Sequence, residues 1–319
     1  MSLTLTMLAL KKSRPGAKYV IWSRIDQKSC FKSILTAGLE PAIIELVRVG
    51  EELQTDLTAM KDAITALAPH NVLAIFSTTS CFAPRAPDDL ISIGKMCKEF
   101  NIPHIINNAY GLGSSKCCHL VNEAARVGRV DVFVQSTDKN LMVPVGKRVF
   151  SVRTGIKPPP ISGGAVIAGF DKKLVGEISQ SYPGRASNGP TLDVFVTLLS
   201  MGVQGYKALL EDRKRVFSSL VTQLENLEAQ YPVKVMRSKN NTISVALALK
   251  LETDSKRLTS IGSQLFTRGV SGTRVVTGLE VKSVEGVMFQ GWGAHTDHCG
   301  QAYLTAAAGL GMTALELER

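Results

Sequence analysis

Asp-Val-Phe-Val-Gln-Ser-Thr-Asp-Lys-Asn, residues 131–140, joins a strand-like run to a group of short polar side chains and a lysine. We predict a strand at 132–134, so Lys139 follows the carboxyl end of a strand, where α/β enzymes place reactive groups. A lysine amine there can form a Schiff base with pyridoxal phosphate if its surroundings lower its pKa. The alternative is an ordinary solvated lysine, and the rest of the chain decides between them.

The sequence around this stretch alternates short β-rich runs with amphipathic runs. Strands are predicted at 19–22, 42–49, 72–76, 104–106, 132–134 and 165–168. Helices are predicted at 2–10, 27–37, 55–67 with Thr55 as N-cap, 88–100 and 118–126. This order predicts a doubly wound, mainly parallel sheet that binds ligands at the carboxyl ends of its strands.

Polar residues follow four of these strands, at 26–29, 77–80, 107–111 and 136–139. Helix capping explains any one of these groups, but parallel strands bring all four to one edge of the sheet. We therefore expect a single polar cleft at that edge.

The second half of the chain has a different pattern. A long helix is predicted at 191–231, with bends at Gly202 and Gly205. Strands are then expected at 243–249 and 287–290, and helices at 256–268 and 302–317. A large α/β domain (1–190), a connecting helix (191–231) and a smaller α+β domain (232–319) form the layout of fold-type I pyridoxal phosphate enzymes.

Composition limits the class of protein. The chain has 319 residues, is 45% hydrophobic and carries a net charge of +10, which predicts an acidic partner such as nucleic acid or a small phosphorylated molecule. The six cysteines form no CxxC pair, as expected for a reducing, cytoplasmic compartment. Residues 2–10 lack the flanks of a signal peptide, and no stretch has membrane-spanning length.

Longer strings give the chain a family resemblance. It resembles the O-phosphoseryl-tRNA(Sec):selenocysteinyl-tRNA(Sec) synthase family, SepSecS, along nearly its whole length. The strings that carry the resemblance are IDQKSCFKSI (25–34), STTSCFAPR (77–85), INNAYG (106–111), ARVGR (125–129), QSTDKNLMVPVG (135–146), GAVIAGF (164–170), SYPGRAS (181–187), LFTRGVSGTRVV (265–276) and GAHTD (293–297).

The resemblance implies an enzyme that converts phosphoserine on tRNA(Sec) into selenocysteine, with selenophosphate and pyridoxal phosphate. Lys139 matches the family's cofactor lysine, which also takes the α proton. Asn107 matches the residue facing the pyridine nitrogen, and Gln27 one that approaches the cofactor ring. Without the resemblance, Asn107 would be interpreted as a turn asparagine before Gly111.

The resemblance also assigns three arginines. Arg185 matches the arginine that binds the substrate phosphate, for which a planar guanidinium is well suited. Arg274 matches a residue that reads the acceptor end of the tRNA, and Arg126 one that contacts its backbone. The alternative for each is a solvated surface charge. The resemblance also implies a homotetramer, a dimer of dimers, as the assembly of complete family members.

Residues 295–299 read His-Thr-Asp-His-Cys, all but one of which are good zinc ligands. Adjacent residues rarely all face one ion, and no second cluster supplies further ligands. We therefore predict a polar loop and no metal site.

The chain departs from the family in three places. It begins at a segment internal to the family, stops before the family's C-terminal tail, and carries an insertion at 147–163 (KRVFSVRTGIKPPPISG). The insertion is either a retained in-frame intron or a basic tRNA-binding loop. The alternative to the synthase is accordingly a truncated, non-catalytic form that at most binds tRNA or partner subunits. A third interpretation is another fold-type I enzyme, such as a selenocysteine lyase.

Overall fold

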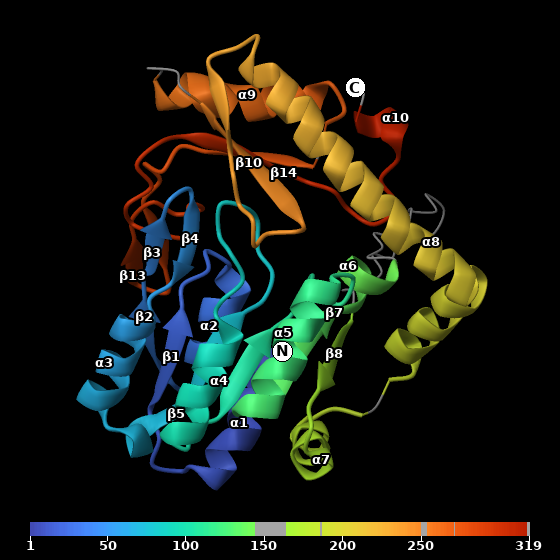
Figure 1. Ribbon diagram of the computed structural model, residues 1–319. Helices are drawn as coiled ribbons and strands as arrows, with labels where there is room; N and C mark the ends of the chain where they lie inside the picture. Colours follow the sequence, from blue (N-terminus) through green and yellow to red (C-terminus); the bar gives the residue numbers. More distant parts are fainter. Residues whose placement is uncertain (144–163, 186, 250–253, 271, 318–319) are drawn as a thin grey trace, which may run out of the picture.

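The computed structural model describes residues 1–143, 164–185, 187–249, 254–270 and 272–317. Within them the large sheet has the strand order β2-β1-β5-β6-β7-β8, and all neighbouring strands are parallel except β8, which runs antiparallel to β7 (Figure 1). Its strands are β1 (Tyr19–Ser23), β2 (Glu40–Ile44), β5 (Val72–Thr78), β6 (His104–Asn107), β7 (Val132–Ser136) and β8 (Ala165–Ala168).

Helices cover both faces of this sheet. Alternate residues of a strand point to opposite faces, and β1 illustrates this: Trp22 packs with Phe31 of α2, whereas Ile21 packs with Met60 of α3. The face of Trp22 is covered by α1 (Ser2–Ser13), α2 (Lys28–Thr36) and α7 (Lys172–Gln180), and the face of Ile21 by α3 (Leu57–Leu67), α4 (Leu90–Glu99) and α5 (Ser115–Val127). The predicted doubly wound arrangement is confirmed.

A smaller antiparallel sheet follows, with the order β11-β14-β10-β9. Its strands are β9 (Val233–Met236), β10 (Ser244–Leu249), β11 (Thr273–Val276) and β14 (Tyr303–Ala307). The long helix α8 (Gly189–Glu228) rises from the large sheet to this one, and with α9 (Ser255–Thr267) it packs apolar side chains against the strands (Figure 1). Gly202 bends α8 with a φ of 62°, whereas Gly205 stays helical, so one of the two predicted bends is wrong.

Two predicted elements near the start of the chain differ from the structure. The strand expected at 42–49 is two strands, because the chain leaves the large sheet at Glu45, whose carboxylate accepts a hydrogen bond from Arg24. The second of them, β3 (Leu46–Val49), pairs with β4 (Glu52–Thr55). The N-cap of α3 is Asp56, which accepts from the Ala59 N–H at 2.8 Å, and Thr55 instead ends β4. A carboxylate is a strong N-cap acceptor, which explains the shift by one residue.

The helix predicted at 302–317 is wrong over most of its length. Residues 303–307 form β14, which lies between β11 and β10 and is almost wholly buried. Alanine favours helices in isolation, but pairing with two neighbouring strands overrides that preference. Gly311, with a φ of 80°, lies in the turn before the short helix α10 (Ala314–Leu317). The strands β12 (Lys282–Val284) and β13 (Val287–Phe289) form a separate hairpin.

The insertion at 147–163 lies outside the described residues. In the parts of the chain that are described, no helix combines the length and apolar character needed to cross a membrane.

Candidate functional site

The carboxyl ends of β1, β5, β6 and β7 meet at one edge of the large sheet, and their polar loops contact one another. The Thr79 hydroxyl donates to Asn108 Oδ1 at 2.5 Å, and the Tyr110 N–H donates to Ser80 Oγ at 3.0 Å. These bonds join the loop after β5 to the loop after β6. The predicted convergence of the polar groups is thereby confirmed for this pair.

Lys139 lies on α6 (Thr137–Leu141), a single helical turn that follows β7 directly, and not in a loop. Its Nζ donates to Ser136 Oγ at 3.2 Å and to Asp138 Oδ2 at 3.1 Å, and it lies 5.4 Å from the centre of the Tyr110 ring. Burial raises the pKa of Asp138, but hydrogen bonds from Ser136 and Lys139 outweigh it, so this pKa lies below its usual value. An ionised carboxylate therefore stays beside the amine.

Lys139 lines a cleft of about 780 Å³ between the large sheet, α8 and the smaller sheet. Tyr110 lines it from the large sheet, Arg213 from α8, and Arg274 and Thr305 from the smaller sheet. A cleft of this size with a few polar groups in an apolar lining is typical of a site for a small molecule.

Asn107 and Gln27 are brought together by a residue that the sequence analysis missed. Asn107 Nδ2 donates to Cys30 Sγ at 3.2 Å, and the Cys30 thiol donates to Gln27 Oε1 at 3.5 Å. Burial raises the pKa of Cys30 to about 12, so the thiol keeps its proton. Gln27 is the N-cap position of α2 and Cys30 lies three residues later, a spacing that could have revealed the contact. Neither Asn107 nor Gln27 lines the cleft of Lys139.

The three predicted arginines occupy different places. Arg274 on β11 lines the cleft, and its guanidinium lies so close to Gly293 that a Cβ there would be 2.5 Å from Nη2. Arg185 is exposed between α7 and α8 and does not line the cleft. Arg126 lies on the surface of α5, where its Nη2 pairs with Glu123 at 2.6 Å. The structure brings Arg274 and Lys139 to one cleft and leaves the other two outside it.

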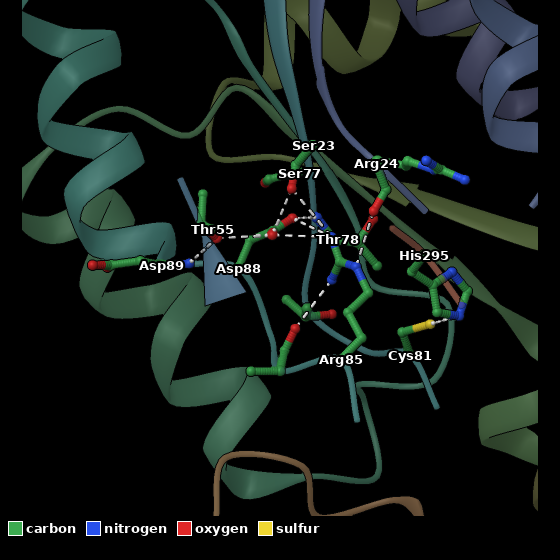
Figure 2. A network of polar contacts seen from close by, with 12 residues as sticks. Ser23, Arg24, Thr55, Ser77, Thr78, Cys81, Arg85, Asp88, Asp89 and His295 are labelled. Atoms are coloured by element: carbon green, nitrogen blue, oxygen red, sulfur yellow. Dashed lines mark hydrogen bonds and ion pairs between the residues drawn. The ribbon is translucent and has the colours of Figure 1, made fainter. Parts of the chain in front are cut away.

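His295 is a buried hydrogen-bond partner of the loop after β1. Its Nδ1 accepts from the Asp26 N–H at 2.8 Å. Its Nε2 lies 3.3 Å from Cys81 Sγ (Figure 2). The neighbouring His298 points to solvent, with 92% of its side chain exposed. Among the described residues, no three His, Cys, Asp or Glu side chains are grouped so as to hold a metal ion.

Asp26 ties the same loop to the C-terminal part of the chain. Its Oδ2 accepts from the backbone N–H groups of Gly293 and His295, and its Oδ1 accepts from Arg24 Nε at 2.9 Å. Since Gln27 is the next residue, these bonds hold the start of α2 against residues 290–295.

Because two histidines, His104 and His295, are buried, we predict that the protein loses folding stability in mild acid. Burial lowers the pKa of His104 and of His295 to about 4, whereas an unfolded histidine titrates near 6.5. Between these values the unfolded chain binds protons that the folded chain does not, so stability is complete above about pH 6.5 and falls as the pH falls. By pH 5 we expect a loss of about 2 kcal/mol per histidine.

Urea unfolding at pH 7.5 and pH 5 measures this loss. His295→Asn keeps an acceptor for the Asp26 N–H but cannot titrate, so its stability should fall less between the two pH values. His298→Asn, at the exposed neighbour, should behave like the parent protein. An equal fall in His295→Asn and the parent would contradict the assignment.

Comparison with known proteins gives the family. The model of the family described as O-phosphoseryl-tRNA(Sec) selenium transferase, SepSecS, matches residues 1–157 and 159–319. The transferase of that name from Dictyostelium discoideum is 44% identical over 339 residues, covering 100% of this chain and 67% of the relative. The one from Caenorhabditis elegans is 40% identical over 319 residues, covering 100% and 62%. The chain thus spans about two thirds of the length of the relatives it matches.

Solved structures agree. The crystal structure of an archaeal O-phosphoseryl-tRNA(Sec) selenium transferase superposes with a TM-score of 0.84 at 26% identity, covering 100% of this chain and 66% of that one. Tryptophan decarboxylase from Catharanthus roseus shares the fold, with a TM-score of 0.67 at 14% identity. The predicted class, a fold-type I α/β protein with a smaller C-terminal α+β unit, is confirmed. By sequence and by structure, the chain belongs to the O-phosphoseryl-tRNA(Sec) selenium transferase family, SepSecS.

Proposed function

We propose that the protein containing this chain converts O-phosphoseryl-tRNA(Sec) into selenocysteinyl-tRNA(Sec), with pyridoxal phosphate attached to Lys139 and selenophosphate as the selenium donor. The observation that carries the proposal is the position of Lys139, which lines a cleft of about 780 Å³ and whose amine lies beside a carboxylate and an aromatic ring. Similarity to the relatives over the whole chain favours the enzyme over a form that only binds tRNA.

The residues at the sheet edge fit the cofactor. Lys139 supplies a primary amine for its aldehyde, and the Tyr110 ring and the polar loops supply a flat surface and hydrogen-bond partners. When bound, pyridoxal phosphate supplies an electron sink for the charge that develops at the substrate α-carbon. We assign Asn107 and Gln27 to cofactor binding, with Cys30 fixing the direction of both amides.

The roles of the chain's own residues follow from their contacts. The Lys139 amine takes the α proton in its uncharged form, and Ser136 and Asp138 orient it by accepting its hydrogen bonds. Arg185 binds the substrate phosphate, Arg274 contacts the acceptor end, and Arg126 binds the tRNA backbone. We place the protein in the cytoplasm, as a homotetramer, with the domain boundaries given by the sequence (1–190, 191–231 and 232–319).

The direct test supplies the purified protein with pyridoxal phosphate, selenophosphate labelled with radioactive selenium, and phosphoseryl-tRNA(Sec). We expect label in the aminoacyl group of the tRNA, and none when seryl-tRNA(Sec) is the substrate. Binding of tRNA without incorporation would favour the non-catalytic alternative. Release of selenium from free selenocysteine, without action on the tRNA, would favour a lyase.

Replacing Arg185 with glutamine should weaken substrate binding. A charge-assisted hydrogen bond to a phosphate contributes about 1.5–3 kcal/mol, so we expect KM for phosphoseryl-tRNA(Sec) to rise about 10- to 100-fold. Cofactor absorbance should not change. Arg257, an exposed arginine on α9, provides the control as Arg257→Gln, which should leave KM unaltered. An unchanged KM in Arg185→Gln would contradict the assignment of Arg185 to the substrate phosphate.

A further inference from the structure

Arg213, on α8, is a buried arginine that no sequence pattern identified. Only 7% of the residue is exposed, yet no carboxylate pairs with it among the described residues. Its Nη2 donates to the Gly113 carbonyl at 2.9 Å, and its buried Nε has no hydrogen-bond partner there. Burial lowers the pKa of Arg213. Burying a guanidinium without a counter-charge costs free energy, which calls for an explanation.

The position of Arg213 is set by the packing of α8. Tyr206, Leu210 and Arg213 are spaced four and three residues apart and so share one face of the helix. The Tyr206 hydroxyl donates to the Asn140 carbonyl at 2.9 Å, next to Lys139, and Leu210 lies beside Gly113. This face of α8 therefore packs against α6 and the loop after β6, which holds Arg213 at the wall of the cleft.

The charges that line the cleft are unbalanced. Lys139, Arg213 and Arg274 line it, and among the described lining residues the carboxylates are those of Asp138 and Glu316. Asp138 already accepts from Lys139 and Ser136, and Glu316 accepts from the N–H and hydroxyl of Thr313. Neither forms an ion pair with Arg213 or Arg274 in the part of the chain that the structure describes. The cleft is therefore lined by two arginines, Arg213 and Arg274, that form no ion pair among the described residues.

We propose that Arg213 forms, with Arg274, a phosphate-binding subsite in the cleft of Lys139, separate from the phosphate contact assigned to Arg185. A guanidinium has five N–H donors, of which Arg213 uses one in the hydrogen bonds described, and its planar fork matches the oxygens of a phosphate group. This proposal depends on the proposed function in one respect, namely where the bound phosphate comes from. The source is either a phosphodiester of the tRNA acceptor end or the free phosphate that the reaction releases.

The experiment measures binding of two probes to the protein saturated with pyridoxal phosphate, so that the cofactor's own phosphate site is filled. The probes are inorganic phosphate and a short oligoribonucleotide ending in CCA, titrated by calorimetry. Arg213→Met should weaken binding of at least one probe about 10- to 100-fold. Arg213→Lys, which keeps the charge without the fork, should weaken it less. The probe that loses affinity identifies the source of the phosphate.

Arg215→Met is the matched control. Arg215 lies two residues away on the same helix, but 79% of its side chain is exposed and it pairs with Asp212. The affinity of the Arg215→Met protein for both probes should equal that of the parent protein. Arg185→Gln is titrated in parallel, so that any phosphate binding at Arg185 is identified by the affinity that this variant loses.

Two results would overturn the proposal. One is unchanged affinity for both probes in Arg213→Met together with a lower melting temperature, which would make Arg213 a structural donor to Gly113. The other is no binding of either probe by the parent protein. Neither result touches the proposed function, which depends on the absorbance of the cofactor at Lys139 and on selenium incorporation.

Discussion

Replacing Lys139 with alanine is expected to remove the visible absorbance of bound pyridoxal phosphate and to lower turnover by at least about 10³-fold. The substitution deletes both the amine that attaches the cofactor and the base that takes the α proton, and loss of a positioned base alone costs about 10²- to 10⁴-fold. Absorbance spectra of the dialysed protein and selenium incorporation into tRNA measure the two effects separately.

Lys173→Ala is the control for this prediction. Lys173 lies on α7 with 84% of its side chain exposed, so its removal should change neither absorbance nor turnover. Far-UV circular dichroism of both variants checks that the fold is intact. Normal turnover in Lys139→Ala would contradict the proposed mechanism, and a normal absorbance band would move cofactor attachment to another lysine.

The large domain could be predicted well because each signal was local. Short β-branched runs such as 72–76 are buried on both faces of a parallel sheet, and Gly38 follows the helix that it was expected to close. Parallel pairing then dictates that the strand ends meet at one edge. Thus the contact between the loops after β5 and β6 followed from strand order alone.

The smaller domain could not be predicted in the same way, because its strands depend on partners distant in sequence. Residues 303–307 are rich in alanine and become a strand only between β10 and β11, which lie about 30–60 residues earlier. The contacts of the Cys30 thiol and of the Arg213 guanidinium could not be predicted for the same reason. Their partners Asn107 and Gly113 come from other elements, and no spacing along the chain encodes those contacts.

The predicted site residues depended on the family resemblance to different extents. Lys139 had a local signal, a lysine after a strand, and the structure adds its cleft. Arg274 had none, since an arginine in a β-rich run is commonly solvated, and its place in the same cleft comes from the pairing of β11 with β14. Arg185, Arg126, Asn107 and Gln27 do not line that cleft. The roles of all the assigned site residues, Lys139 and Arg274 included, stay predictions until variants are measured.

Replacing Asp88 with alanine is expected to lower the free energy of unfolding by about 3–5 kcal/mol. Asp88 is 1% exposed, and both of its oxygens accept from Arg85 Nη2 at 3.0 Å, while Ser23 and the Thr78 N–H donate to it as well (Figure 2). Its removal leaves the Arg85 guanidinium, which is 0% exposed, without a counter-charge. Urea unfolding at pH 7.5 measures the change.

Two comparisons show whether burial is the reason. Glu123→Ala breaks the surface pair with Arg126 and should cost far less than Asp88→Ala, because water screens surface ion pairs. The double variant Arg85→Met, Asp88→Leu removes both charges, so it should be more stable than Asp88→Ala even though it deletes more hydrogen bonds. If the double variant instead lost as much free energy of unfolding as Arg85→Met and Asp88→Ala lose together, the cost would lie in the individual hydrogen bonds of Ser23 and Thr78. The network would then hold β1 and β5 together by those bonds and not through the buried ion pair.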